Sequence, residues 1–254
     1  MSPAKRSRHG ARRPLFRSGS DMKRSFFKRL FSFLFRSFLL LCFISALPML
    51  ALRWVNPSTS SFIELNKANN NTNIRQQWVD IEKVSLYFPN AVIASEDQQF
   101  PSHFGLDFKQ IQLVLSERDK GFSRGASTIT QQTVKNMFLW PDRSIFRKGV
   151  EAWLSLWMEL ILSKKRILEI YVNYAQFGKS VFGIEAASHY YFGIRAENLN
   201  PIQAALITSS LPTPSRSDPA KPSSYLNSRA EFIMDQMPRV GGRRVIQEII
   251  DAGH

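Results

Sequence analysis

The feature that most constrains this chain is an apolar run that follows a strongly basic segment near the N-terminus. Residues 37–52, SFLLLCFISALPMLAL, carry no charge, and counting back through Arg36 to Phe31 lengthens the run to 22 residues. At about 1.5 Å per residue, a helix of this length spans roughly 33 Å, enough for the roughly 30 Å hydrocarbon core of a bilayer. The sequence therefore predicts a transmembrane anchor over residues 31–54, with Arg53 and Trp54 at its interfacial end.

A cleaved signal peptide is the alternative interpretation of this segment. A charged region followed by an apolar stretch fits both, and Ser45 and Ala46 are residues of the size found near cleavage sites. We favour the uncleaved anchor, because the apolar run continues through Met49 to Leu52.

The positive charge of the chain is concentrated at this end. The 34 Lys and Arg exceed the 20 Asp and Glu by 14, and residues 1–36, whose one acid is Asp21, contribute +10 of that excess. A nucleic-acid binder carries such charge on the folded surface that meets phosphates, so we expect no nucleic-acid partner. The positive-inside rule places a basic tail, residues 1–30, in the cytoplasm and the sequence after Trp54 across the membrane. The single cysteine, Cys42, excludes an intramolecular disulfide and a cysteine-based metal site.

The remaining sequence predicts a mainly α fold. Residues 55–75 are rich in Ser, Asn and Thr and are interpreted as a juxtamembrane linker, followed by a folded domain over 76–240 and a C-terminal tail over 241–254. Apolar residues at spacings of three and four predict helices, whereas long alternating strand patterns are missing. The expected helices begin near residue 90 and span 109–117, 128–139, 150–162, 164–175, 201–210 and 226–237, with an extended, proline-rich segment over 211–224.

The first stretch with catalytic potential is ASEDQQFPSHFG, residues 94–105. An apolar segment precedes Glu96, so a helix from about Asn90 would deliver this carboxylate from hydrophobic surroundings, with Pro101 ending the helix. A carboxylate that loses hydration becomes a better base at neutral pH. Taken alone, an acidic pair such as Glu96 and Asp97 is more often a solvated helix cap.

The second stretch is GASTITQQTVKN, residues 125–136. Ser127 or Thr128 can cap a helix that aligns Thr128, Gln131 and Lys135 on one face. Hydroxyls at a helix N-terminus with a lysine farther along suit a phosphate or sugar phosphate. The alternative is an ordinary capped helix with a polar outer face.

The third stretch is RSIFRKGVE, residues 143–151, which leads into an almost wholly apolar helix. Glu151 stands beside Arg147 and Lys148, which suggests a functional cluster, although a glutamate near a helix N-terminus is also a routine partner of the helix dipole. Farther along, Glu169 and Asn173 are one helical turn apart and predict structural hydrogen bonding.

In this order and spacing, these stretches resemble the peptidoglycan glycosyltransferases of glycosyltransferase family 51. The family pattern EDxxFxxHxG is met by residues 96–105, GxSTITQQ by 125–132, RKxxE by 147–151 and ILExYxN by 167–173. The segment GIEAASHYYFG from Gly183 is also similar, whereas Thr133 stands where a leucine is usual and Ser180-Val181 where the family often has a glycine. The resemblance covers the predicted domain and implies a lysozyme-like glycosyltransferase lobe with a small hydrophobic jaw. The candidate jaw is residues 104–122, with Phe104, Leu106, Phe108, Leu113, Val114 and Phe122.

The resemblance also implies a reaction. The family polymerises lipid II into β-1,4 glycan strands, with inversion and release of undecaprenyl diphosphate. Glu96 is then the base that takes the proton of the acceptor hydroxyl, and Glu151 is a second catalytic acid that orients cations or holds a divalent metal, Mg or Mn, on the diphosphate. The implied substrate-binding residues are Asp97, His103, Ser127, Thr128, Gln131, Gln132, Lys135, Asn136, Arg143, Arg147 and Lys148.

The resemblance finally implies location and partners. The expected protein is a single-pass inner-membrane enzyme with a periplasmic catalytic domain, acting on lipid II and the growing glycan strand, in contact with membrane lipid and with cell-division or cell-wall synthesis proteins. No transpeptidase activity is expected, since the SxxK sequences at 20–23 and 25–28 lie in the basic segment. The alternatives are a lysozyme-like lytic enzyme acting on finished peptidoglycan and a non-catalytic cell-wall scaffold.

Overall fold

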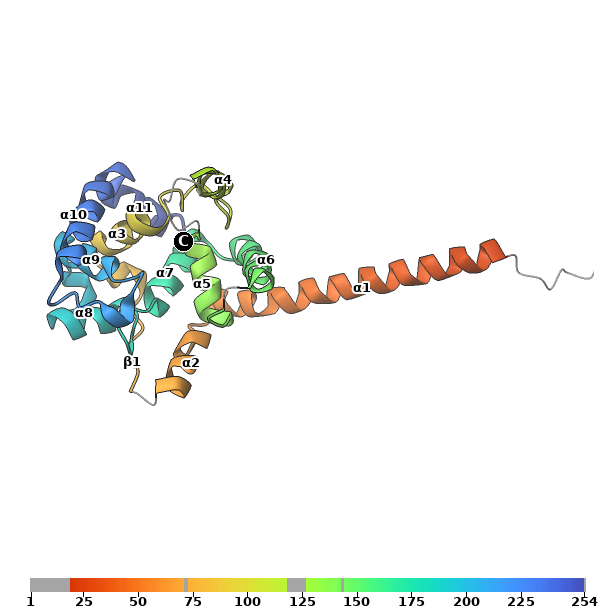
Figure 1. The fold of residues 1–254 in the computed structure, drawn as a ribbon, viewed down its shortest axis with the longest axis horizontal. Helices are drawn as coiled ribbons and strands as arrows, with labels where there is room; N and C mark the ends of the chain where they lie inside the picture. The colour runs from red at the N-terminus through yellow and green to blue at the C-terminus, as the bar shows by residue number, and fades with distance from the viewer. Residues whose placement is uncertain (1–18, 71–72, 118–126, 143, 254) are drawn as a thin grey trace, which may run out of the picture. The chain divides into compact units, whose positions relative to one another are not determined.

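The computed structural model describes residues 19–70, 73–117, 127–142 and 144–253. The chain divides into two compact units, Met1–Ser45 and Ala46–His254. Helix α1 (Gly19–Trp54) begins in the first unit and ends in the second (Figure 1). All three stretches with catalytic potential belong to the second unit.

Helix α1 contains the predicted anchor. Its segment Phe26–Trp54 is long and apolar enough to cross a membrane, and most of its side chains are exposed in the structure. Exposed apolar surface of this extent calls for lipid or a partner to cover it, which supports membrane anchoring. The helix begins at Gly19, within the range expected as a basic tail, because Lys and Arg are good helix formers and no Gly or Pro occurs between Ser20 and Leu47.

The second unit is mainly α, as predicted. Its helices are α2 (Ser61–Asn70), α3 (Tyr87–Glu96), α4 (Phe108–Glu117), α5 (Ile129–Phe138), α6 (Ile145–Ile161), α7 (Lys164–Tyr174), α8 (Ile184–Phe192), α9 (Pro201–Ser209), α10 (Ser224–Arg239) and α11 (Gly242–Asp251). Short 3₁₀ turns form at η1 (Ile81–Lys83), η3 (Ala196–Asn198) and η4 (Pro214–Arg216). Strands β1 (Arg75–Gln76) and β2 (Val181–Phe182) pair in parallel, with Arg75 opposite Val181.

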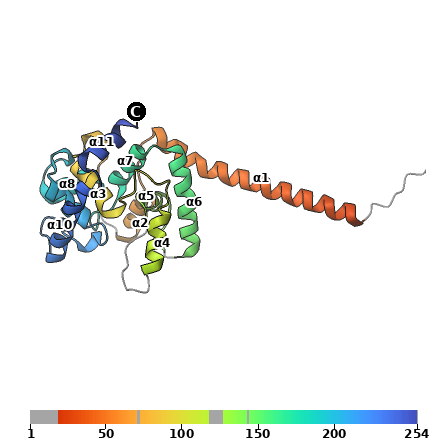
Figure 2. The ribbon, with the colours of Figure 1, turned by 90° about the horizontal axis from the view of Figure 1, so that it is seen from above.

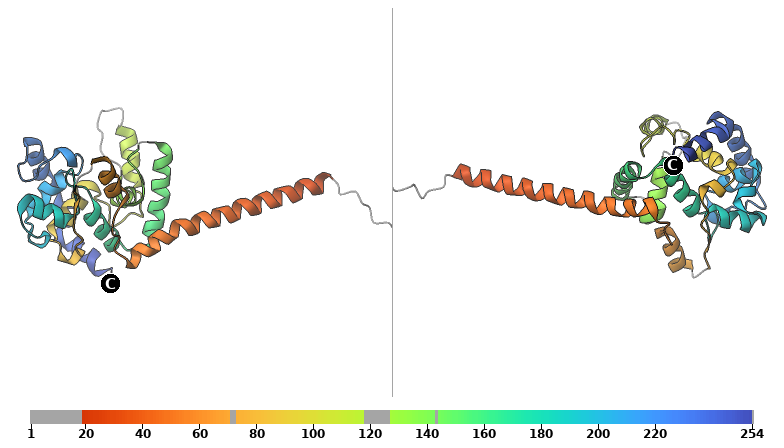
Figure 3. Two further views of the ribbon diagram at one scale, coloured as in Figure 1. Left: turned by 90° about the horizontal axis from the view of Figure 1, so that it is seen from below. Right: turned by 180° about the vertical axis from the view of Figure 1, so that it is seen from behind.

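The helices of the second unit pack in two groups. Helix α3 packs against α9, α10 and α11, whereas α5 packs against α2, α6 and α7. Helices α8 to α10 lie on one side of the unit, with α4 and α6 on the other (Figures 2 and 3). Because α3 ends at Glu96 and α5 begins just after Thr128, the first two catalytic stretches meet where the groups adjoin.

Helix α7 is largely buried inside the second unit. Its residues from Ile167 to Tyr174 are all buried, and six of these eight residues are apolar or aromatic. The two polar members of this run are satisfied inside the protein. Glu169 accepts a hydrogen bond from the backbone N–H of Ile81 at 3.1 Å, and the Asn173 amide pairs with both backbone groups of Val79 at 2.8 Å. The predicted structural role of Glu169 and Asn173 is confirmed.

Gly183, at the start of α8, stands where both the backbone conformation and the available space favour glycine. It precedes α8 with a φ of +78°, and a Cβ placed there would lie 2.6 Å from the backbone oxygen of Asn173. A side chain would therefore push α8 away from α7.

Besides the start of α1, the expected elements differ from the structure in four places. No helix was expected over α8. The expected linker, residues 55–75, contains α2, and the expected C-terminal tail contains α11, whose Ile246, Ile249 and Ile250 are buried. Their spacing of three and four is the usual signal of an amphipathic helix, which a short terminal segment made easy to overlook. The proline-rich segment 211–224 is not extended throughout, because it includes the turn η4.

An exposed apolar surface surrounds the predicted jaw. Phe104 and Leu113 are about half exposed and Phe108 is 71% exposed, while Phe146 and Leu160 of α6 are also exposed. Such a surface marks contact with lipid or protein. The side chain of Val114 and all of Phe122 lie outside the described residues.

We predict that this surface binds membranes without the first unit. A protein lacking residues 1–45 should float with liposomes, and Phe104→Ser with Phe108→Ser should weaken its partitioning at least tenfold, since burying one such side chain contributes about 1.5–3 kcal/mol. The matched control is Tyr225→Ser, which removes an exposed aromatic residue from α10. Equal flotation of all three proteins would show that this surface does not contact lipid.

Candidate active site

The carboxylate of Glu96 lies where three helices meet. Its Oε2 accepts a hydrogen bond from Gln132 Nε2 of α5 at 3.1 Å, and its Oε1 accepts one from the neighbouring Ser95 Oγ at 2.9 Å. A guanidinium nitrogen of Arg229, on α10, lies 3.5 Å from the same Oε1. The side chain of Glu96 is 16% exposed, so the carboxylate is oriented by the protein and still reaches solvent.

Gln132 is itself held in place by a buried tyrosine. The Tyr171 hydroxyl of α7 donates to Gln132 Oε1 at 3.3 Å. Burial raises the pKa of Tyr171 well above its usual value, and the negative charges of Glu96 and Asp97 act in the same direction. Tyr171 therefore stays protonated and remains a donor across the neutral range.

Asp97 connects the loop after α3 to the start of α5. Its buried carboxylate lies 2.8 Å from His103 Nε2 and accepts a hydrogen bond from the backbone N–H of Ile129 at 2.9 Å. An anion at the first turn of a helix also interacts favourably with the helix dipole. The structure thus places Asp97 and His103 in contact with each other inside the protein, and their contact with substrate stays a prediction.

Thr128 and Gln131 form a capping box at the start of α5. The Thr128 hydroxyl oxygen accepts from the backbone N–H of Gln131 at 3.1 Å, and the Gln131 side chain accepts from the backbone N–H of Thr128 at 3.1 Å. The Thr128 hydroxyl donates to the backbone oxygen of Gly105 at 2.7 Å. The alternative interpretation is right about the cap. Its polar outer face does not include these two residues, because both side chains are buried.

Glu159 is a structural carboxylate to which sequence analysis gave no role. It lies on α6 and accepts hydrogen bonds from Thr130 of α5 at 2.5 Å and from Lys164 of α7 at 2.7 Å. Lys164 also donates to the backbone oxygen of His103 at 2.7 Å. These bonds tie the loop that carries Asp97 and His103 to three helices, a connection that no local spacing reveals.

The third catalytic stretch forms a charged cluster at the start of α6. The buried carboxylate of Glu151 pairs with Arg147 through one oxygen, at 2.6 Å, and with Lys148 through the other. Lys148 also donates to Ser127 Oγ at 2.9 Å. Arg147 is buried and its Nε donates to the backbone oxygen of Asp142 at 2.6 Å, whereas Lys148 is 44% exposed. Lys148 is therefore the member of the cluster that solvent and substrate can reach.

The charges of this cluster also act on Lys135 of α5. Burial lowers the pKa of its ammonium, which the nearby cations Arg147 and Lys148 lower further, while the carboxylates Glu151 and Glu96 act in the opposite direction. Lys135 also lies over the Phe62 ring of α2, 5.6 Å from its centroid. Ser127 and Gln132 connect this cluster to Glu96. Ser127 Oγ accepts from Lys148, and its backbone oxygen lies 3.4 Å from Gln132 Nε2, which also donates to Glu96.

The remaining predicted site residues are Asn136 and Arg143. Asn136 follows Lys135 on α5 and is half-buried. Arg143 lies outside the described residues.

Arg229 is a site residue that sequence reasoning missed. It donates to Ser95 Oγ at 3.1 Å and approaches Glu96, from a position 133 residues farther along the chain. Its Nε is buried without a hydrogen-bond partner among the described residues, a cost that proteins usually retain only for a reason. The periodicity over 226–237 predicts a helix here, but nothing local indicates that its arginine faces Glu96.

The described residues do not form a protein metal site in this arrangement. Among them, no group of three or more His, Cys, Asp or Glu side chains is placed to hold a metal ion. Both oxygens of Glu151 are engaged by cations of the chain itself.

Comparisons with known proteins show the family of this chain. A family model described as Transglycosylase matches residues 64–238, which include every motif named above. The chain belongs to the transglycosylase family. The mainly α, lysozyme-like fold expected for this family is confirmed.

Relatives of the chain share one description, biosynthetic peptidoglycan transglycosylase. The chain is 48% identical to such a protein from Marinomonas sp. (strain MWYL1), over 66% of this chain and 75% of the relative. It is 43% identical to one from Shewanella oneidensis, over 84% and 94% of the two chains. A third, from Pseudomonas putida (strain KT2440), is 42% identical over 79% and 88%.

Removing the Thr128 side chain should measurably destabilise the protein, because it breaks the capping box. Thr128→Ala should lower the free energy of unfolding by about 1–2 kcal/mol, because a backbone donor of α5 and the oxygen of Gly105 both lose their partner. Chemical denaturation of the full-length protein in detergent measures this change. Thr213→Ala, at an exposed threonine, is the control and should change it by less than about 0.5 kcal/mol. Equal values for the two variants would contradict the structural role.

Proposed function

We propose that this transglycosylase polymerises lipid II into β-1,4 glycan strands and releases undecaprenyl diphosphate. The proposal rests on one oriented, solvent-reaching carboxylate, Glu96, and on a cationic cluster that hydrogen bonds through Gln132 and Ser127 link to it. Synthesis from a diphosphate-linked donor needs both parts, a base for the acceptor and positive charge for the leaving group. The names of the relatives support the same reaction.

Glu96 is the proposed base. An acceptor sugar placed against it loses the proton of its 4-hydroxyl to the carboxylate while the oxygen attacks the anomeric carbon of the donor. General-base catalysis of this kind contributes about 10²–10⁴ in rate. Gln132 and Arg229 orient the carboxylate, so it does not have to be ordered when the acceptor arrives.

The cationic cluster is the proposed site for the leaving diphosphate. As the donor bond breaks, negative charge grows on the phosphates, and preorganised cations lower the energy of that state. Lys148 is reachable, and an anion bound beside Lys135 would favour the charged form of that buried lysine. The remaining proposed contacts are Ser127, Asn136 and Arg143. The side chains of Gln131 and Arg147 are buried and act on the site through the groups they hold in place.

Glu151 is proposed to organise these cations and not to contact substrate directly. Its two oxygens hold Arg147 and Lys148 in one arrangement. A divalent cation, which the resemblance left open, would in this account arrive with the diphosphate, since the Glu151 oxygens are already paired.

The same account includes a topology. The basic residues before the apolar segment favour a cytoplasmic N-terminus, and we propose that the second unit faces the periplasm, where lipid II is polymerised. Proteins of cell division or cell-wall synthesis are further expected partners.

The decisive functional assay compares two substrates. Purified full-length protein should convert lipid II to glycan polymer, with release of undecaprenyl diphosphate, and leave finished peptidoglycan intact. Release of fragments from finished peptidoglycan would support the lysozyme-like alternative, in which the cationic cluster has no diphosphate to bind. Inactivity on both substrates would favour the non-catalytic scaffold.

Lys148 provides a test of the leaving-group site. Lys148→Ala should reduce turnover of lipid II by about 10–100-fold, since one charged contact in a transition state contributes about 1.4–2.7 kcal/mol. Thermal unfolding is measured beside turnover, because the variant also takes a partner from the buried Glu151 and should unfold at a somewhat lower temperature while remaining folded. Lys221→Ala removes an exposed lysine outside the site and should keep full turnover. Full turnover of the Lys148 variant would remove this residue from the mechanism.

Arg229 provides a test of how Glu96 is oriented. Arg229→Gln should lower the turnover number about tenfold, because the carboxylate loses its charged partner. Arg229→Lys, which keeps the charge, should restore part of that loss. Arg239→Gln is the matched control from the same helix, where the arginine pairs with Asp235 at the surface. If all three variants turn over alike, Arg229 does not position Glu96.

A further inference from the structure

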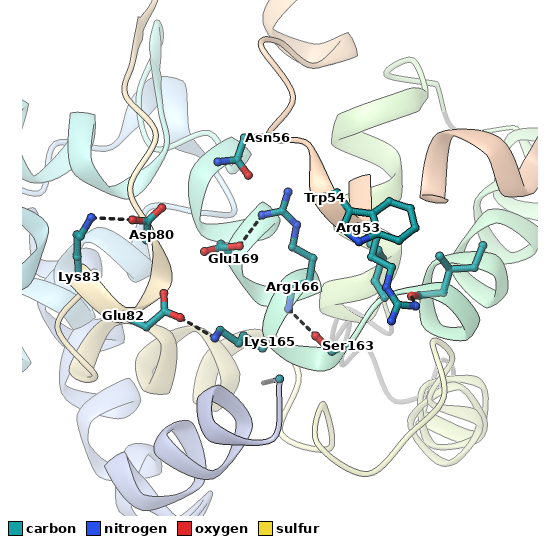
Figure 4. A pocket seen from close by; sticks show the side chains of 13 residues that line it. Arg53, Trp54, Asn56, Asp80, Glu82, Lys83, Ser163, Lys165, Arg166 and Glu169 are labelled. Atoms are coloured by element: carbon teal, nitrogen blue, oxygen red, sulfur yellow. Dashed lines mark hydrogen bonds and ion pairs between the residues drawn. The ribbon is translucent and has the colours of Figure 1, made fainter. Parts of the chain in front are cut away.

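A second candidate site lies at the end of α1, apart from the residues of the active site. A pocket of about 850 Å³ opens there, within the second unit. Figure 4 shows Arg53 and Trp54 on one wall, Asp80, Glu82 and Lys83 on the other, and Lys165 and Arg166 between them. Its lining also includes Asn56, residues 161–163, Glu169 and Gly253.

The charges of this pocket leave a positive excess on one wall. Each lining carboxylate is already paired: Asp80 with Lys83 at 2.7 Å, Glu82 with Lys165 at 2.6 Å and Glu169 with Arg166 at 2.6 Å. These pairs neutralise three of the four lining cations.

The fourth cation, Arg53, has neutral neighbours among the residues that the structure describes. Its guanidinium donates to the backbone oxygen of Ile161 at 3.4 Å and lies 5.6 Å from the centroid of the Trp54 ring. Neither group balances its charge, so a guanidinium that can take a bidentate anion faces this pocket.

The pocket is built rigidly against the last turn of α1. Arg166 donates to the backbone oxygen of Leu52 at 2.8 Å and to that of Val55 at 2.9 Å, so one side chain binds the carbonyl end of α1 to α7. A cation at a helix C-terminus is also favoured by the helix dipole. Met49 and Leu52 of the same turn are buried.

The position of the pocket indicates where its ligand would come from. Arg53 and Trp54 end the segment that is apolar enough to cross a membrane, and Trp54 is 73% exposed. Arginine and tryptophan at the end of such a segment lie at the level of lipid headgroups. A phosphate carried by a membrane lipid would thus be held at the height of the pocket.

We propose that this pocket binds the phosphate of an anionic membrane phospholipid, with Arg53 as its principal ligand. Ser163 and Asn56 line the same space and supply neutral hydrogen-bonding groups for the glycerol part of the headgroup. The proposal depends on α1 as a membrane anchor and is independent of the catalytic roles given to Glu96 and Glu151.

The test uses full-length protein in a neutral detergent and soluble short-chain phosphatidylglycerol as the probe. Calorimetric titration should show saturable binding, which Arg53→Ala weakens at least tenfold and Arg53→Lys weakens less. Arg244→Ala, at an exposed arginine of α11, is the matched control and should bind like the unaltered protein. Circular dichroism checks that each variant is folded, and the Arg53→Lys variant keeps the test informative if the alanine variant is not.

Two further probes separate the sources of phosphate. Short-chain phosphatidylcholine, whose headgroup is neutral overall, and inorganic phosphate should each bind at least tenfold more weakly than phosphatidylglycerol. Equal binding of phosphatidylcholine would show that the anion is not recognised, and equal binding of inorganic phosphate would show that the lipid is not. Undiminished binding by both Arg53 variants would also overturn the proposal.

Discussion

The start of helix α5 is the constraint on which the rest of the site depends. The Asp97 carboxylate accepts from the backbone N–H of Ile129, and Thr128 both caps the helix and binds the backbone of Gly105. Gly105 has a φ of +74°, and a Cβ there would approach the backbone of α6 to 3.1 Å, so the loop fits closely against that helix. Once α5 begins at this point, Gln132 lies one turn on, beside Glu96. Buried, satisfied polar groups of this kind fix geometry, since moving any of them would leave a partner unpaired.

The same helix joins two kinds of surface that the proposed reaction requires. On one side, Lys135 shares its electrostatic field with Glu151, Arg147 and Lys148, which are arranged to meet an anion. Helices α4 and α6 lie on the side of the unit away from α8 to α10 (Figure 2), and phenylalanine and leucine side chains of both helices are exposed and suited to lipid. A substrate with a diphosphate and a long lipid chain needs both at once, which explains why a domain with a polar active site keeps so much exposed apolar surface.

Much of this arrangement could be predicted from the sequence. The rest depends on contacts between segments far apart in the chain, which local sequence patterns do not indicate. Helical periodicity located α5, α7 and α9, and the motif order indicated the family, because both signals are carried by neighbouring residues. Thr128 and Gln131 were predicted as substrate ligands, whereas the structure shows them in a capping box. The cap was the alternative that the sequence also allowed, but the burial of both side chains was not expected. The contact of Arg229 with Glu96 could not be predicted, because it joins helices far apart in the chain and depends on how α10 packs on α3.

The central claim is that Glu96 acts as the base, and the initial rate of lipid II polymerisation by Glu96→Gln tests it most directly. The amide keeps the shape of the side chain but cannot take the acceptor proton, so the rate should fall about 10²–10⁴-fold with little change in unfolding temperature. Glu231→Gln, an exposed position on α10, should keep the full rate. A folded Glu96→Gln protein that retains more than about a tenth of the rate would contradict this account.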